Sequence, residues 1–272
     1  MLPHQLVVVT GANRGLGRAI VECFAKAHSS GALSLVLVGR DSAGLVQLQH
    51  SLSKWESVKP YVVGEATLDS VDKLDNVAQN ISSVIEDIRD RSPPITKAVL
   101  INNAGTLGPL SKKMSEYNTK EIHDYFNLNV VSFAALSASF VKHFRPAETD
   151  DVKPIEPRLV IVNISSLLAV KPFKNWGLYA AGKAARDMFL QIMAMEEGHN
   201  DIKTLSYAPG PLEGDMQQQV RESIGDEEQR RYFAQQHAEG KLVEMHDSAQ
   251  KLLRLLQDDT FTSGSHVDFY DV

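Results

Sequence analysis

The chain has 272 residues, of which 43% are hydrophobic and 23% charged, a composition typical of a globular protein with a substantial core. The formal net charge of -6 excludes a global positive field that attracts nucleic acid or acidic membranes, so any anion site must be local. The one cysteine, Cys23, excludes a disulfide within the chain, and we find no metal-ligand spacing, secretory signal or membrane span. We therefore expect a cytoplasmic protein without a metal site.

Short apolar runs alternate with longer amphipathic stretches along the chain. Runs that are nearly continuous in apolar residues are typical of strands covered on both faces. The predicted strands are residues 5–10, 33–39, 59–64, 97–103, 158–165, 202–208 and 265–270, and clear helical patterns occupy 17–29, 41–52 and 71–91. Repeated strand–helix units predict an α/β fold with a doubly wound, Rossmann-type parallel seven-stranded sheet, in a single domain over residues 1–272. Residues 146–157, acidic and rich in proline, indicate a surface loop.

The first strand ends in a glycine-rich stretch, TGANRGLG, with Gly11, Gly15 and Gly17. Glycines at such a turn let a pyrophosphate approach the backbone, and the following helix N-terminus supplies free N–H donors. We therefore predict a dinucleotide site here, with an ordinary glycine-rich turn as the alternative. Arg40 ends the second strand, where an arginine suits the 2'-phosphate of NADP, and Arg14 could reach the same phosphate. Either arginine could instead be a surface residue, and the carboxylate of Asp41 could serve a plain ribose.

The stretch LYAAGKAAR places Tyr179 and Lys183 on one face of a predicted helix, and Ser166 lies thirteen residues before Tyr179. A nearby ammonium favours the phenolate, so we expect Lys183 to lower the pKa of Tyr179. The tuned phenol can then give a proton to a carbonyl oxygen that the Ser166 hydroxyl holds. Taken singly, the three residues could be an interfacial aromatic, a surface lysine and a helix cap.

These motifs, together with INNAG at 101–105 and Asn129 in NLNV, resemble the short-chain dehydrogenase/reductase family along nearly the whole chain. The resemblance implies that Asn129 holds a water in the proton relay, although it could equally be a structural residue at a helix bend. It also implies that Lys183 binds the nicotinamide ribose and that NNAG lies against the adenine side of the cofactor. The residues expected to bind NADP(H) are Gly11, Asn13, Arg14, Gly15, Leu16, Gly17, Arg40, Asp41, Thr67, Leu68, Asn103, Ala104, Gly105, Tyr179, Lys183, Leu212, Gly214, Asp215, Met216 and Gln217.

Three longer stretches, at 163–189, 207–218 and 263–272, resemble the family's NADPH-dependent reductases of pterin side-chain carbonyls in tetrahydrobiopterin biosynthesis. By this resemblance Ser166, Tyr179 and Gly210 contact substrate, residues 212–217 close over the nicotinamide half of the cofactor, and Asp268 anchors the pterin. A carboxylate can accept the neighbouring amino and ring N–H groups of a pterin. A reductase of diketones and other carbonyls is the alternative, and a non-catalytic nucleotide sensor is a third hypothesis.

Three further expectations concern the surroundings of the site. The family usually has an acidic residue where this chain has Thr67, which leaves the adenine contact open between Thr67 and its acidic neighbours. Residues 213–240 are polar and could form a lid over the site or two ordinary surface helices. The apolar residues Phe126, Val130, Phe133, Leu136 and Phe140, with those of the helix from Gly177, exceed what one buried face requires, which predicts a homodimer.

Overall fold

The computed structural model describes residues 3–28, 31–145, 157–197 and 202–272. Its centre is a parallel sheet of seven strands, as the sequence predicts, and the strands lie in the order β3-β2-β1-β4-β5-β6-β7. The strands are β1 His4–Thr10, β2 Ala32–Val38, β3 Val58–Val63, β4 Lys97–Asn102, β5 Arg158–Ile164, β6 Ile202–Ala208 and β7 Ser265–Asp268. The strand order reverses between β1 and β4, which is where open α/β sheets bind ligands.

Both faces of the sheet are buried, which explains why the strand sequences are predominantly apolar. In β1, Val7 and Val9 belong to the core on one face, whereas Leu6 and Val8 belong to the core on the other. Successive side chains point to opposite faces of a strand, so a doubly covered strand needs apolar residues at every position.

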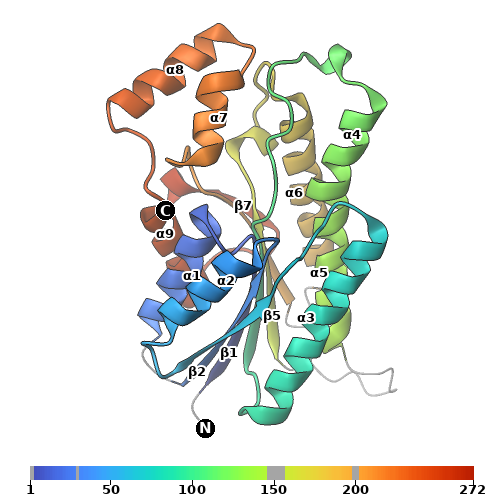
Figure 1. Ribbon diagram of the computed structural model, residues 1–272, viewed down its shortest axis with the longest axis vertical. Helices are drawn as coiled ribbons and strands as arrows, with labels where there is room; N and C mark the ends of the chain where they lie inside the picture. The colour runs from blue at the N-terminus through green and yellow to red at the C-terminus, as the bar shows by residue number, and fades with distance from the viewer. Residues whose placement is uncertain (1–2, 29–30, 146–156, 198–201) are drawn as a thin grey trace.

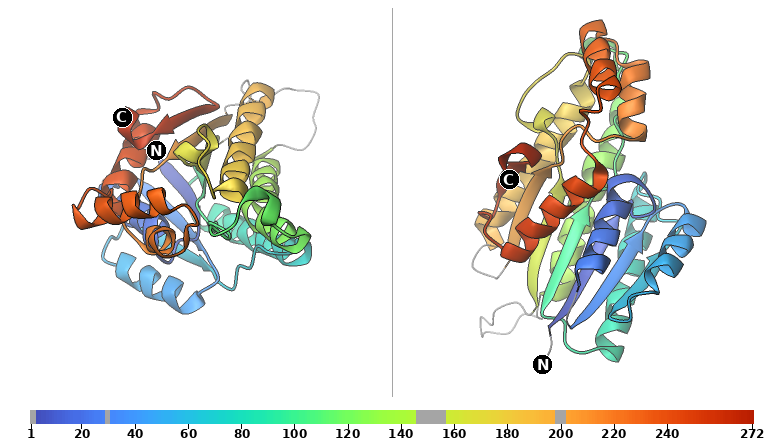
Figure 2. Two further views of the ribbon diagram at one scale, coloured as in Figure 1. Left: turned by 90° about the horizontal axis from the view of Figure 1, so that it is seen from above. Right: turned by 90° about the vertical axis from the view of Figure 1, so that its left-hand side faces the viewer.

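Two layers of helices cover the sheet (Figure 1). The helices α1, α2 and α9 pack on one face, and α3, α5 and α6 pack on the other, an arrangement that Figure 2 shows from above. The helices are α1 Gly15–Ala27, α2 Ser42–Leu52, α3 Val71–Arg91, α4 Thr119–Phe126, α5 Ser132–Phe144, α6 Gly177–Glu197, α7 Asp215–Ser223, α8 Glu227–Ala238 and α9 Met245–Asp258.

The helices α7 and α8 stand above the carboxyl ends of the strands (Figure 1). They occupy most of the segment 213–240 and share a small apolar core of their own, in which Ile224 is fully buried against Leu107, Leu110 and Trp176. The indole Nε1 of Trp176 also donates to Gln229 Oε1 at 2.7 Å. The helices α7 and α8 are therefore joined to the rest of the fold through the loops that follow β4 and β5.

Two further expectations have different outcomes. The acidic loop predicted at 146–157 falls almost entirely outside the described residues. Phe133, Leu136 and Phe140 lie in the core beneath α5, so they contribute no surface for a second subunit, and that part of the expectation was wrong. In the parts of the chain that the structure describes, we find no helix long and apolar enough to cross a membrane.

Candidate active site

The predicted site residues converge at the carboxyl ends of the strands. The glycine loop follows β1, NNAG follows β4, Ser166 follows β5, Gly210 follows β6, and Asp268 ends β7. In a parallel sheet these ends meet at one edge. Residues separated by more than 250 positions in the sequence therefore border the same space.

The glycine loop has no room for a side chain at Gly17. A Cβ on Gly17 would lie 2.2 Å from the carbonyl oxygen of Gly11 and 2.6 Å from Nδ2 of Asn103. Gly11 and Gly15 adopt φ values of 67° and 57°, in the left-handed region that glycine enters without strain. The loop therefore needs glycine at these positions to turn from β1 into α1.

The N-terminus of α1 can receive an anion. Arg14 occupies the N-cap position without a capping side-chain hydrogen bond, and the first turn holds no acidic residue. No carboxylate of the helix's own first turn competes for these N–H groups, and the helix dipole favours a negative charge there. Leu16 is buried beneath the loop and fixes it to the core. The cradle fits the pyrophosphate of a dinucleotide.

Asn103 and Ala104 brace the glycine loop from the neighbouring strand. Asn103 Nδ2 donates to the carbonyl oxygens of Thr10 at 3.0 Å and Gly11 at 3.2 Å. The backbone N–H groups of Asn103 and Ala104 both donate to Thr10 Oγ1 at 3.0 Å. The NNAG motif thus holds the end of β1, and these bonds give it a structural role that requires no ligand.

Arg40 and Asp41, at the end of β2, have different surroundings. Asp41 caps α2, since its Oδ1 accepts the N–H of Gly44 at 3.0 Å and its Oδ2 lies 3.5 Å from Asn13 Nδ2. Arg40 is exposed and forms no ion pair with any described residue. The carboxylate is already used for structure, whereas the guanidinium is free to meet a phosphate.

Near the end of β3, Thr67 is partly buried and its hydroxyl donates to the carbonyl oxygen of Glu65 at 3.3 Å. Leu68 is buried in the core beneath it. Glu65 has a φ of 52° and an exposed side chain, and Asp69 pairs with Lys73 at 3.3 Å. The adenine contact therefore stays open between the Thr67 hydroxyl and the exposed carboxylates of Glu65 and Asp69.

Asn129 is buried in a one-turn π-helix, Asn127–Val131, between α4 and α5. Its Nδ2 donates to the carbonyl oxygen of Tyr125 at 3.0 Å, and its Oδ1 accepts the N–H of Thr106 at 2.8 Å. A Cβ on Gly105 would lie 2.9 Å from the same Oδ1. Both alternatives for Asn129 are thus compatible with its position, because π-helical turns often occur at functional sites and this asparagine also satisfies backbone groups at the bend.

Tyr179 and Lys183 lie on one face of α6, as their spacing predicts. Lys183 Nζ is 5.4 Å from the centroid of the Tyr179 ring and donates to the carbonyl oxygen of Ile164, at the end of β5, at 2.6 Å. Ser166 Oγ accepts the N–H of Leu168 at 3.2 Å, so this hydroxyl also caps a short 3-10 turn, Leu167–Ala169. The Ser166 side chain also lies close enough to Tyr179 to lower the pKa of its phenol.

The pKa of Tyr179 differs from the expectation. Burial raises the pKa of Tyr179 above its ordinary value, and Arg186 and the Ser166 side chain lower it by less. Burial also holds the pKa of Lys183 well below its usual value, and Arg186 acts in the same direction. The prediction that Lys183 lowers the pKa of Tyr179 was therefore wrong for this state of the protein, because desolvation of the phenol outweighs the neighbouring charges.

Arg186, which the sequence analysis did not single out, is a second buried cation behind the tyrosine. Its Nη2 donates to the carbonyl oxygen of Asn102 at 2.6 Å and its Nη1 to that of Ala104 at 3.4 Å, and its guanidinium lies 4.6 Å from the Phe133 ring centroid. Burial lowers its pKa to about 10. The signal in the sequence is an arginine one turn after Lys183 on a predominantly apolar helix.

The segment expected to close over the cofactor runs from Leu212 into α7. Leu212 forms an isolated bridge with Val243, and Gly214 is the N-cap of α7, where a Cβ would lie 2.3 Å from Cε of Met245. Asp215 pairs with Arg14 at 2.8 Å, and both side chains are largely exposed. The two ends of the predicted cofactor site are therefore joined across the glycine loop.

The next two residues of α7 face different ways. Met216 is exposed, whereas Gln217 is buried and its Oε1 has no hydrogen-bond partner among the described residues. A buried acceptor without a donor costs free energy unless something else pairs with it. Gln217 thus has an unused acceptor in the segment expected to cover the nicotinamide.

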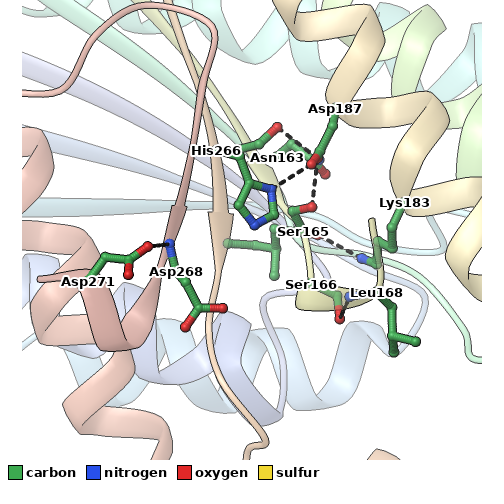
Figure 3. Close-up of polar contacts among 11 residues, drawn as sticks. Asn163, Ser165, Ser166, Leu168, Lys183, Asp187, His266, Asp268 and Asp271 are labelled. Atoms are coloured by element: carbon green, nitrogen blue, oxygen red, sulfur yellow. Dashed lines mark hydrogen bonds and ion pairs between the residues drawn. The ribbon is translucent and has the colours of Figure 1, made fainter. Parts of the chain in front are cut away.

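The predicted substrate contacts Gly210 and Asp268 lie at the carboxyl ends of β6 and β7. Gly210 has a φ of 78°, and a Cβ there would approach Val243 at 3.0 Å. Asp268 is partly buried, and its Oδ1 accepts the N–H of Tyr270 at 3.0 Å. Figure 3 shows Asp268 on β7, across from Ser166 and Lys183. The Asp268 carboxylate also accepts the backbone N–H of Asp271 in a capping box, so it holds the turn that follows β7 as well as facing the site.

Comparisons with known proteins agree on one family. The profile of the short chain dehydrogenase family matches residues 5–225. The chain is 42% identical to the sepiapterin reductase of Rattus norvegicus over 268 residues, which cover 97% of this chain and 96% of that protein. It is 27% identical to a benzil reductase ((S)-benzoin forming) of Bacillus cereus, over 96% of this chain and 97% of that one. The crystal structure of the KRED1-Pglu enzyme has a TM-score of 0.78 at 23% identity, covering 97% of this chain and 100% of that chain.

Proposed function

This chain belongs to the short-chain dehydrogenase family, and from that premise we propose that it is an NADPH-dependent reductase of pterin side-chain carbonyls, with sepiapterin as a substrate. The observation that carries the proposal is the placement of Asp268 across from Ser166 and Lys183 (Figure 3). The spacing gives a pterin two points of attachment, one at its ring and one at its reacting carbonyl. The high identity to a sepiapterin reductase over nearly the whole chain supports the same substrate.

The bound cofactor supplies a hydride. Tyr179 gives the proton to the carbonyl oxygen, and the Ser166 hydroxyl holds that oxygen while the charge develops. The raised pKa of Tyr179 suits this direction of reaction, since it keeps the phenol protonated at neutral pH. Arg186 lowers the pKa of Tyr179 and so favours the phenolate that forms, and we propose that Lys183, 5.4 Å from the ring centroid, adds to this effect when it is protonated. Asn129, beside the NNAG loop, is proposed to hold a water that returns the proton.

Three groups support NADPH rather than NADH. Arg40 is free, Asp41 is occupied as a helix cap, and Arg14 stands at the head of α1. A guanidinium is well suited to a phosphate because it offers several donors in one plane. We propose that the 2'-phosphate binds Arg40 and draws Arg14 away from Asp215. The segment 213–240 then acts as a cover that closes against the cofactor.

We also propose a homodimer formed through α6 and the helices beside it. Met188, Ile192 and Met195 of α6 are exposed, as are Ile122 of α4 and Val131 before α5. This is a row of large apolar side chains on neighbouring helices, which is unusual on a protein surface unless a partner covers it. Sedimentation of a monomer at micromolar concentration contradicts this part of the proposal. The buried lone Cys23 is consistent with a proposed cytoplasmic location.

The test of the function measures NADPH oxidation with sepiapterin and with a small diketone, for the wild type and two variants. Tyr179→Phe should lose most turnover of both substrates, because the proton donor is gone. Asp268→Ala should lose sepiapterin turnover and retain diketone turnover, because only the pterin needs the anchor. If the wild type reduces the diketone and not sepiapterin, the benzil reductase-like alternative is correct.

A further inference from the structure

A layer of polar side chains crosses the sheet below the active site. Asn163 on β5, Ser206 on β6 and His266 on β7 are in register and therefore lie side by side on the same face. Asn163 and Ser206 are buried, and Asn163 Nδ2 lies 3.3 Å from Ser206 Oγ. Polar side chains in line across three strands are unusual in a parallel sheet whose buried positions are mostly apolar.

Asp187 of α6 is the centre of this layer (Figure 3). Its Oδ1 accepts hydrogen bonds from Asn163 Nδ2 at 2.8 Å and Ser165 Oγ at 2.6 Å, and its Oδ2 pairs with His266 Nδ1 at 2.6 Å. The Asp187 side chain is only 6% exposed and that of His266 16%. One carboxylate thus joins the end of β5 to β7 from the helix above them.

The two members of the ion pair each stand close to a proposed functional residue. Asp187 follows Lys183 by four positions, so both project from the same face of α6. His266 precedes Asp268 by two positions on β7, so the two side chains lie on the same face of the sheet. The pair therefore links the helix that holds the proton donor to the strand that holds the proposed pterin anchor.

Strand β7 needs such a link more than the inner strands do. It is the four-residue edge strand of the sheet, pairs only with β6, and none of its residues is fully buried. Short edge strands open more readily than central ones because few contacts hold them. The Asp187–His266 bond is the ion pair that ties β7 to the helical layer among the described residues.

We propose that Asp187 and His266 are positioning residues, which fix β7 against α6 and so set the separation between the Asp268 anchor and the Tyr179–Lys183 pair. This proposal rests on the proposed function, since it assigns Asp268 to the pterin ring. A substrate held at both ends needs this separation to be fixed. A small diketone, held only at its reacting carbonyl, does not.

The charges around His266 favour the ion pair. Its hydrogen bond to Asp187 raises the pKa of the imidazole, burial opposes this, and Asp268 and Asp271 add smaller effects in the raising direction. Lys183 and Arg186 are the cations on α6, and Ser206 on β6 is uncharged. His266 Nε2 is buried without a partner among the described residues, so the Nδ1 bond to Asp187 is the one that holds the ring.

The test compares His266→Leu with His266→Asn in the full-length enzyme, using NADPH with sepiapterin and with a small diketone. Leucine removes the donor, whereas asparagine places an N–H donor where Nδ1 stands. We expect His266→Leu to lower kcat/KM for sepiapterin by about tenfold or more and to leave that for the diketone within about twofold. His266→Asn should restore most of the loss. Equal losses with both substrates, or no loss with either, would overturn the proposal.

Amide hydrogen exchange separates this proposal from the proposed function. His266→Leu should speed exchange in β7 and leave β1 protected, which also shows that the variant folds, and His266→Asn should restore protection. If the wild type does not reduce sepiapterin, the proposed substrate fails, and faster exchange in β7 still supports the positioning role. Unchanged exchange in β7 overturns the positioning role whatever the substrate.

Discussion

Lys183 lies between Tyr179 and the end of strand β5. Its Nζ is 5.4 Å from the centroid of the Tyr179 ring and donates to the carbonyl oxygen of Ile164 at 2.6 Å. One amine thus contacts the backbone from which Ser166 projects and stands over the ring of the proposed proton donor. The spacing of the catalytic cluster depends on this single side chain.

Replacing Lys183 should therefore lower the activity of the enzyme and not only its stability. We expect Lys183→Met to lower kcat/KM by about a hundredfold or more, because the phenolate loses a stabilising cation and the cofactor ribose loses a donor. Steady-state NADPH oxidation measures the loss. Lys171→Met, at an exposed lysine outside the cluster, is the control and should retain activity. Equal activity of both variants contradicts the assignment.

The raised pKa of Tyr179 predicts the pH dependence of reduction. A donor must be protonated, and a pKa above the ordinary value of 10.0 keeps the phenol protonated throughout the neutral range. Reduction should therefore show no decline from Tyr179 until the pH approaches that raised value, and it should fall as the pH rises further. A pH profile of kcat/KM measures this. A basic limb near about pH 7 that Tyr179→Phe removes would contradict the direction of the shift.

Gly17 should tolerate no side chain. We expect Gly17→Ala to destabilise the protein by about 2 kcal/mol and to weaken NADPH binding, because its Cβ meets the Gly11 carbonyl oxygen and the loop must move. Gly39→Ala is the matched control for stability, since a Cβ there stands at an ordinary 3.5 Å from its neighbours. Thermal unfolding and NADPH titration measure the two effects. Equal melting temperatures for the two variants are incompatible with this packing argument.

Arg40 should decide between the two nicotinamide cofactors. Arg40→Ala should raise KM for NADPH by about tenfold or more and leave KM for NADH almost unchanged, because only NADPH carries the phosphate that the guanidinium meets. Arg18→Ala is the control, since Arg18 is an exposed arginine of α1 paired with Glu22. Parallel changes in both KM values would show that Arg40 does not discriminate between the cofactors.

The Asp187–His266 pair should make stability depend on pH. The folded state raises the pKa of His266, so its contribution is fully present below the unfolded value near 6.5 and is lost as the pH rises through the raised folded value. His266→Asn does not titrate. The difference in melting temperature between wild type and His266→Asn should therefore be larger near about pH 6 than near about pH 9. A difference that does not change with pH contradicts the ion pair.

The fold and most of the proposed site could be predicted from local patterns. Strand β1 has four consecutive apolar residues, Leu6 to Val9, because both faces are covered, and that run is visible in the sequence itself. Tyr179 and Lys183 share a helix face because they are four residues apart. The glycines of the first loop predict that two backbone segments approach each other closely. The space at Gly17 confirms this, because a Cβ there would lie 2.2 Å from the carbonyl oxygen of Gly11.

The direction of the Tyr179 pKa could not be predicted in the same way. Spacing shows that a cation is near, but the pKa depends on how much water is lost around the phenol, and this depends on side chains from several segments. Trp176, Leu107 and Ile224 share an apolar cluster with Tyr179 and come from loops far apart in the chain. Desolvation by such neighbours has no local signature.

The sequence by itself determined the order of strands and helices, the glycine loop, the helix face shared by Tyr179 and Lys183, and the family to which they belong. These features depend on residues close together in the chain, whose spacing is fixed by helix and strand geometry. Only the tertiary structure decided that Arg14 meets Asp215, that Arg186 is buried behind the tyrosine, and that Asp187 binds His266. Those contacts join elements that are far apart in the sequence and that the parallel sheet brings together at its edge. The distances between their charged groups are therefore set only when the chain folds.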